Sequence, residues 1–279
     1  MFFNKKIIRM CTLLEHHFKK IIAQMEKEYD IKVLYACESG SRAWGFSSQE
    51  SDYDVRFIYI HHPSWYLSID RKRDVIEIPK RDSLSIPVDP LLDISGWELT
   101  KALKLFRKSN PPLLEWLHSN MIYYQRFSTI EKMRNLEKEV FSPTSTIYHY
   151  INMAKGNFRE YLQGDIVKIK KYFYVLRPVL AAKWVQSFET IPPMEFNTLV
   201  QMLIPMGALR IKIESLVERK KSGQKLAFEP RINLINEFLD TEINLLETYA
   251  KGLEKNLLDP TERLNDLFRN TLNEAWENN

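Results

Sequence analysis

Two short apolar runs separated by a polar loop constrain this chain more than any other feature. The first run covers residues 33–37 and the second covers residues 55–60. Each is rich in β-branched and aromatic residues, which is typical of a buried strand. A Gly-Ser pair at 40–41 follows the first run, and an Asp-x-Asp motif at 52–54 leads into the second. The pattern predicts two neighbouring strands with a polar loop at one edge of a sheet.

The loop carries residues suited to phosphate chemistry. Asp52 and Asp54 point to the same face if the second strand begins at Asp52. Two carboxylates this close repel each other unless a cation neutralises them, and a divalent metal ion does so well. Gly40 and Ser41 can present backbone N–H groups and a hydroxyl to phosphate oxygens. A phosphate-binding turn beside a carboxylate pair indicates metal-assisted phosphoryl or nucleotidyl transfer.

The composition fits one large domain or two small ones. The 279 residues are 44% hydrophobic and 27% charged, with a formal charge of +4 that is compatible with nucleotide or nucleic acid as ligand. Cys11 and Cys37 lie in apolar stretches and predict buried thiols rather than a disulfide. We find no secretory signal and no apolar run of about 18 residues, so we expect a cytoplasmic protein without a membrane span.

Helical periodicity fills most of the remaining chain. Residues 5–28 predict a first amphipathic helix, residues 74–78 a third strand, and the patterns from residue 142 onward are helical. Ser95 and Glu98 have the spacing of a capping box, which predicts that a helix begins there. The sequence therefore predicts an α+β fold, a small mixed sheet with flanking helices followed by an all-helical C-terminal domain.

The motifs resemble those of a known superfamily. The Gly-Ser pair, a gap of ten residues and the Asp-x-Asp motif are similar to the signature of the DNA polymerase β-type nucleotidyltransferases. The longer strings at 40–46 and 51–56 resemble a narrower group, the YcgL-type nucleotidyltransferases of an RNA repair (RNA ligase) pathway. The resemblance implies a polymerase β-like catalytic domain over residues 1–126. It also implies a helical domain over residues 127–279 that closes the nucleotide cleft.

The resemblance assigns the catalytic and metal-binding roles to three aspartates. Asp52 and Asp54 match the paired ligands that would bind two Mg²⁺ ions against the triphosphate. Superfamily members add a third carboxylate on a later strand, and residues 92–99 resemble that motif at Asp93. Asp93 would hold the metal that activates the attacking hydroxyl, or act as the base. The carboxylates that stay open as alternatives for this third position are Glu77, Asp89 and Glu98.

The Gly-Ser turn supplies the first set of predicted nucleotide contacts. Gly40 and Ser41 match the residues that contact the β- and γ-phosphates in the superfamily. Arg42 follows them directly. Its guanidinium can either reach a phosphate or form an ion pair with a neighbouring group, and the sequence favours neither.

A second set of nucleotide contacts is predicted in the helical half. Lys170, Tyr174 and Arg177 fall on one face of a helix predicted over residues 167–187. A basic and aromatic face of this kind can hold a triphosphate or stack a base. The alternative is a solvated face whose alkyl stems pack on the core.

Together these features predict a Mg²⁺-dependent nucleotidyltransferase. An acceptor hydroxyl would attack the α-phosphate of a nucleoside triphosphate such as ATP, and pyrophosphate would leave. The acceptor would be an RNA end, a protein side chain or a small molecule. One alternative is a nucleotide-binding regulatory module without turnover, which Thr100 leaves open because relatives often have arginine there. Another is an antitoxin-like enzyme that nucleotidylates a protein partner.

Overall fold

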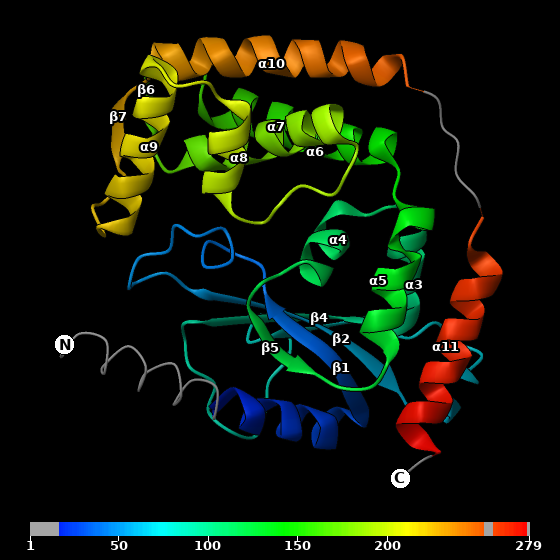
Figure 1. Cartoon of the computed structure of the whole chain (residues 1–279). Helices are drawn as coiled ribbons and strands as arrows, with labels where there is room; N and C mark the ends of the chain where they lie inside the picture. The colour runs from blue at the N-terminus through cyan, green and yellow to red at the C-terminus, as the bar shows by residue number, and fades with distance from the viewer. Residues whose placement is uncertain (1–16, 254–258, 278–279) are drawn as a thin grey trace, which may run out of the picture.

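The computed structural model describes residues 17–253 and 259–277, and a mixed sheet forms one end of it (Figure 1). The sheet has five strands in the order β3-β4-β2-β1-β5. Strands β2 and β4 run parallel, and the other neighbours run antiparallel. The strands are β1 (Ile31–Glu38), β2 (Tyr53–His61), β3 (Val75–Ile78), β4 (Leu92–Glu98) and β5 (Ile122–Gln125). The strands predicted from the two apolar runs are therefore the central pair.

Helices cover both faces of this sheet. The helix over residues 17–29 packs Phe18, Ile21 and Met25 against one face. The rest of the predicted helix 5–28, with Cys11, lies outside the described residues, and Cys37 is a buried free thiol. The helices that contribute to the core on the other face are α3 (Leu99–Arg107), α4 (Pro111–Leu117), α5 (Thr129–Val140) and α11 (Thr261–Trp276).

A second core lies in the helical layer above the sheet (Figure 1). Helix α7 buries most of its residues between Tyr172 and Val185, which is expected for the central helix of a layer. None of the described helices combines the length and apolar character needed to cross a bilayer. The helices of this layer are α6 (Pro143–Tyr161), α7 (Lys171–Phe188), α8 (Phe196–Leu203), α9 (Ala208–Lys221) and α10 (Asn233–Lys251).

The second half is helical as predicted, apart from one small sheet. Strands β6 (Ile166–Lys168) and β7 (Phe228–Pro230) pair antiparallel beside α9. Strand β6 takes the first residues of the segment predicted as a long helix, so α7 begins at Lys171 instead. Helices α5 and α11 also belong to residues 127–279, yet they pack in the core of the sheet. The helices after residue 126 are thus shared between two cores.

The predicted capping box is wrong, because residues 95–98 complete strand β4. This segment pairs with β2 on one side and with β3 on the other, and two ladders stabilise a strand more than one cap stabilises a helix. Glu98 still caps a helix, but as the residue before α3. Its side chain accepts a hydrogen bond from the Thr100 N–H at 2.7 Å.

The loop after β1 ties the sheet to the helical layer. The Trp44 carbonyl accepts a hydrogen bond from the Phe196 N–H at 3.0 Å. The Phe46 ring lies 4.7 Å from the Phe173 ring and 5.5 Å from the Phe196 ring, inside the helical core. These contacts hold the Gly-Ser turn between the two cores. The loop that carries the predicted motifs therefore faces residues of the second half of the chain.

Candidate active site

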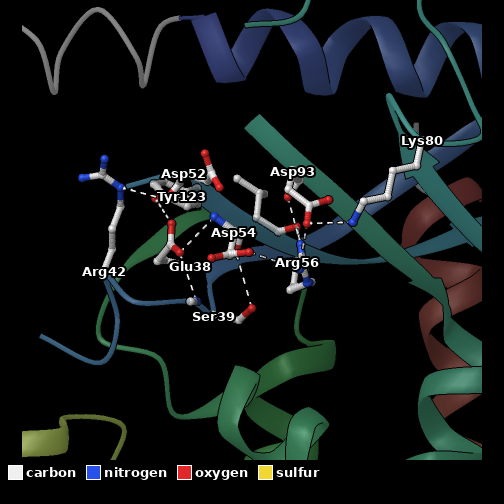
Figure 2. Close-up of polar contacts among 11 residues, drawn as sticks. Glu38, Ser39, Arg42, Asp52, Asp54, Arg56, Lys80, Asp93 and Tyr123 are labelled. Carbon is white, nitrogen blue, oxygen red and sulfur yellow. Dashed lines mark hydrogen bonds and ion pairs between the residues drawn. The ribbon is translucent and has the colours of Figure 1, made fainter. Parts of the chain in front are cut away.

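Asp54 and Asp93 lie side by side on neighbouring strands. They are register partners in the parallel ladder between β2 and β4. The Arg56 guanidinium lies between them, 3.4 Å from Asp54 Oδ1 and 3.3 Å from Asp93 Oδ2 (Figure 2). The Lys80 ammonium is 3.0 Å from Asp93 Oδ2. Two cationic side chains thus neutralise a carboxylate pair that would otherwise repel itself.

Asp52 reaches the site from the loop rather than from the strand. Strand β2 begins at Tyr53, and the Asp52 side chain is exposed. Among the residues that the structure describes, no three His, Cys, Asp or Glu side chains are placed to hold a metal ion. The carboxylate oxygens suit a hard cation such as Mg²⁺. For a metal to bind all three aspartates, Arg56 and Lys80 would have to release Asp54 and Asp93.

A buried glutamate accepts hydrogen bonds from the Gly-Ser turn and from Asp54. Glu38 is 0% exposed, and its Oε1 accepts from the Gly40 N–H at 3.1 Å and the Asp54 N–H at 3.0 Å. Its Oε2 accepts from the Tyr123 hydroxyl at 2.7 Å (Figure 2). Burial raises the pKa of Glu38, and these hydrogen bonds oppose that rise. The sequence interpretation missed this residue, whose one signal is a glutamate at the end of an apolar strand.

Gly40 is packed directly against Asp54. A Cβ atom on Gly40 would lie 1.7 Å from Asp54 Oδ2, which no side chain can tolerate without movement. The Ser39 N–H also donates to the Asp54 carbonyl at 3.0 Å. Burial raises the pKa of the Asp54 carboxyl, and Arg56 opposes this rise. The Gly-Ser turn and the Asp54 carboxylate therefore fix each other's position.

One cavity lies between the Gly-Ser turn with Asp54 and the helical layer. Its volume is about 380 Å³, and it opens between the Gly-Ser turn and the start of α7. Lys220, at the end of α9, is a lining residue that the sequence interpretation missed. Burial, and next the charge of Lys170, lower the pKa of Lys220. The predicted site residues that line the cavity are Gly40, Ser41, Asp52, Asp54, Lys170 and Tyr174.

Comparison with known proteins identifies the family of this chain. The family model described as the RNA repair pathway DNA polymerase beta family, RlaP, matches residues 14–270. The chain belongs to this family. The RlaP match is supported by a relative, the uncharacterized protein YcgL of Bacillus subtilis (strain 168). It is 52% identical over 256 residues, which cover 92% of this chain and 95% of YcgL.

A solved structure was also compared with this RlaP chain. A nucleotidyltransferase-like protein from Exiguobacterium sibiricum 255-15 aligns with 94% of this chain and 90% of its own, at 10% identity and a TM-score of 0.33. A likeness at that level carries no argument about the site. The assignment of roles therefore depends on the contacts within this chain.

Arg42 supports the loop instead of lining the cavity. Its guanidinium donates to the carbonyl of Ser51 at 2.6 Å and to that of Asp52 at 3.3 Å. It also lies 3.6 Å from the centre of the Tyr53 ring. These contacts hold the backbone just before Asp52. Among the described residues Arg42 donates to backbone carbonyls instead of forming an ion pair, and its contact with a phosphate stays a prediction.

Arg177 is a structural residue, and its predicted contact with nucleotide is wrong. Its side chain is buried, 5% exposed, and forms an ion pair with Glu115 at 2.9 Å. The guanidinium lies 4.6 Å from the centre of the Trp44 ring, which itself lines the cavity. Lys170 and Tyr174, at the start of the helix, line the cavity, whereas Arg177 is buried further along it.

Asp93 is the carboxylate that the structure places beside Asp54. It does not line the cavity itself, but Arg56 links it to Asp54 at the cavity wall. The three alternatives are engaged elsewhere. Glu77 pairs with Arg81 at 3.2 Å, Asp89 accepts from the Leu91 N–H at 2.9 Å, and Glu98 caps α3 at the opposite end of β4.

Proposed function

We propose that this RlaP-family chain transfers a nucleoside monophosphate from a nucleoside triphosphate to an acceptor hydroxyl. The observation that carries the proposal is the cavity with Asp52 and Asp54 on one wall and Lys170 and Lys220 on the other. Carboxylates suit a metal ion, and lysines suit the phosphates that the metal ion does not neutralise. Family membership supports a nucleotide as the substrate.

The triphosphate would lie between the Gly-Ser turn and the lysines. Gly40 has no side chain, so a phosphate can approach its backbone, and the Ser41 hydroxyl can donate to a phosphate oxygen. The ammonium groups of Lys170 and Lys220 would bind the β- and γ-phosphates. Tyr174, which is 38% exposed, lies where a nucleobase can stack on it.

Asp52, Asp54 and Asp93 would hold two Mg²⁺ ions, once Arg56 and Lys80 release Asp54 and Asp93. Bound Mg²⁺ would polarise the α-phosphate and lower the pKa of the acceptor hydroxyl. The hydroxyl oxygen forms a bond to the α-phosphorus while the bond to the α–β bridging oxygen breaks. The hydroxyl proton would pass to Asp93 once Arg56 and Lys80 no longer pair with it, and pyrophosphate would leave against Lys170 and Lys220. The acceptor would be an RNA end, a protein side chain or a small molecule.

Release of pyrophosphate tests this proposal. The protein is incubated with Mg²⁺, each nucleoside triphosphate and either an RNA pool or a protein pool. We expect pyrophosphate to be released only when the acceptor is present. The rate of release should fall at least about 100-fold in Asp52→Asn/Asp54→Asn, because this variant loses metal affinity but no core packing. The matched control is Asp70→Asn/Asp240→Asn, which changes two exposed aspartates outside the cavity.

Two other results would favour the alternatives. Tight triphosphate binding by calorimetry without pyrophosphate release from any pool would contradict transfer and favour a regulatory module. An added nucleotide mass on a co-purified protein, with none on RNA, would favour an enzyme that modifies a protein partner.

A further inference from the structure

A second basic cavity continues from the nucleotide cavity. Its volume is about 500 Å³, and it shares Glu50, Lys170 and Lys220 with the first. It extends from the loop after β1 to the small sheet of β6 and β7, which lies beside α9 (Figure 1). We call this second cavity the β6–β7 groove. Its further lining includes Lys168, Gln224, Lys225 and Phe228.

The β6–β7 groove carries an excess of positive charge. Four lysines line it, Lys168, Lys170, Lys220 and Lys225, against the single carboxylate of Glu50. The adjacent Arg219 and Lys221 pair with acidic side chains, whereas the four lysines take part in no ion pair between described residues. Closely spaced cations without acidic partners repel each other, which favours an anionic ligand.

An exposed aromatic ring lies at the end of this lysine row. Phe228 is 69% exposed, and it is the register partner of Lys168 across the β6–β7 pair. An apolar ring kept in water beside a lysine is the pairing that binds single-stranded nucleic acid, where phosphates meet the cation and a base stacks on the ring. A polymer of acidic residues alone would use the lysines but give Phe228 no partner of its own.

We propose that the β6–β7 groove binds the phosphate backbone of a single-stranded nucleic acid whose end reaches the nucleotide cavity. The strand would run from Phe228 along Lys225 and Lys168 to the wall of Lys170 and Lys220. The two cavities meet at Lys170 and Lys220, so a strand that contacts Lys225 and Lys168 leaves those two ammonium groups to the triphosphate. The role of the strand as acceptor rests on the proposed function, whereas its binding does not.

Fluorescence anisotropy of a labelled 15-nucleotide RNA with the full chain tests this groove. We expect Lys168→Gln/Lys225→Gln to weaken binding at least tenfold. The slope of log affinity against log salt should fall by about 1.4, since each phosphate contact on a single strand contributes about 0.7. Phe228→Ala should weaken binding at least fivefold with little change in that slope, because stacking releases no counterions. The control is Lys19→Gln/Lys20→Gln, the same charge change on the helix over residues 17–29, with binding within twofold.

Two results would contradict the proposal that the β6–β7 groove binds nucleic acid. One is RNA binding by Lys168→Gln/Lys225→Gln equal to that of the unmutated chain. The other is displacement of the RNA by a polyglutamate of equal charge as effectively as by unlabelled RNA, which would indicate an acidic protein partner. Triphosphate binding, measured by calorimetry on the unmutated chain, tests the proposed function separately. If the variants lose RNA affinity as expected but the unmutated chain binds no triphosphate, the β6–β7 groove binds nucleic acid and the proposed nucleotidyl transfer is wrong.

Discussion

Gly40 and Glu38 show how single residues shape the site. Glu38 holds the N–H groups of Gly40 and Asp54 with one oxygen, so the turn and the aspartate share a buried acceptor. Gly40 leaves the space that Asp54 occupies. Each of the two residues therefore sets the position of the Asp54 carboxylate.

Gly40→Ala should abolish nucleotide transfer. The added methyl group would overlap Asp54 Oδ2, so either the turn or the carboxylate moves. A displacement of about 1 Å at a reacting group lowers rates by about 100-fold. We expect a loss of at least that size in pyrophosphate release.

Gly156→Ala is the matched control for this substitution. Gly156 lies within α6, and a Cβ atom there would meet nothing within 4 Å. Activity should be unchanged, and urea unfolding should show a gain of about 0.5–1 kcal/mol from better helix propensity. Equal activity losses in both variants would contradict the close packing at Gly40.

His61 should make the fold sensitive to mild acid. Burial lowers the pKa of His61 from 6.5 to about 4, and the ring stacks on Trp65 at 4.2 Å. As pH falls from 6.5 to 4, the unfolded chain takes up a proton that the folded chain refuses, so the free energy of unfolding decreases. Below pH 4 both states carry the proton and this contribution levels off. The full effect is on the order of 3 kcal/mol.

His61→Phe separates this effect from general acid destabilisation. The variant keeps a ring for Trp65 and removes the titrating group. Urea unfolding between pH 7 and 4 should give a shallower pH dependence for the variant. Identical pH profiles for both proteins would show that His61 does not contribute.

At the scale of elements, helix α7 connects the site to the helical core. Lys170 and Tyr174 line the cavity at its start, whereas Arg177 is buried against Glu115 further along. The spacing of these residues predicts one shared face, but only Lys170 and Tyr174 line the cavity. The spacing does not predict the contact between Arg177 and the Trp44 ring, because Trp44 lies in the loop after β1, far away in the sequence.

Arg177→Met should destabilise the fold by about 3–5 kcal/mol, because it leaves the Glu115 carboxylate buried without its cation. The second substitution, Glu115→Gln, removes that charge and keeps an acceptor for the Tyr150 hydroxyl, which donates at 2.5 Å. Urea unfolding should therefore show partial recovery in the double variant. A single variant as stable as the unmutated chain would contradict the buried ion pair.

The elements that could be predicted from the sequence are those with a local signal. Strands β1 and β2 follow from their apolar runs, and the Gly-Ser and Asp-x-Asp motifs follow from spacing. The end of β4 was mistaken for a helix cap because strand pairing depends on distant residues. Strand β6 has three residues and exists only through its pairing with β7. Lys220 reaches the cavity through the packing of α9, which no local pattern encodes.

At the scale of the whole molecule, the candidate site lies between two cores. The sheet and its helices supply the aspartates, and the helical layer supplies the lysines. The loop of Trp44 and Phe46 joins them through contacts with α7 and α8. The molecule thus lines one cavity with carboxylates from the side of the sheet and lysines from the helical layer.

The fate of two radioactive labels tests the central claim most directly. The chain is incubated with Mg²⁺, RNA and a nucleoside triphosphate labelled at either the α- or the γ-phosphate. Nucleotidyl transfer predicts that the α-label becomes covalently attached to the RNA and that the γ-label leaves in pyrophosphate. In Asp54→Asn, neither attachment of the α-label nor release of the γ-label should occur. Attachment of the γ-label, or α-label attachment that persists in Asp54→Asn, would contradict the account.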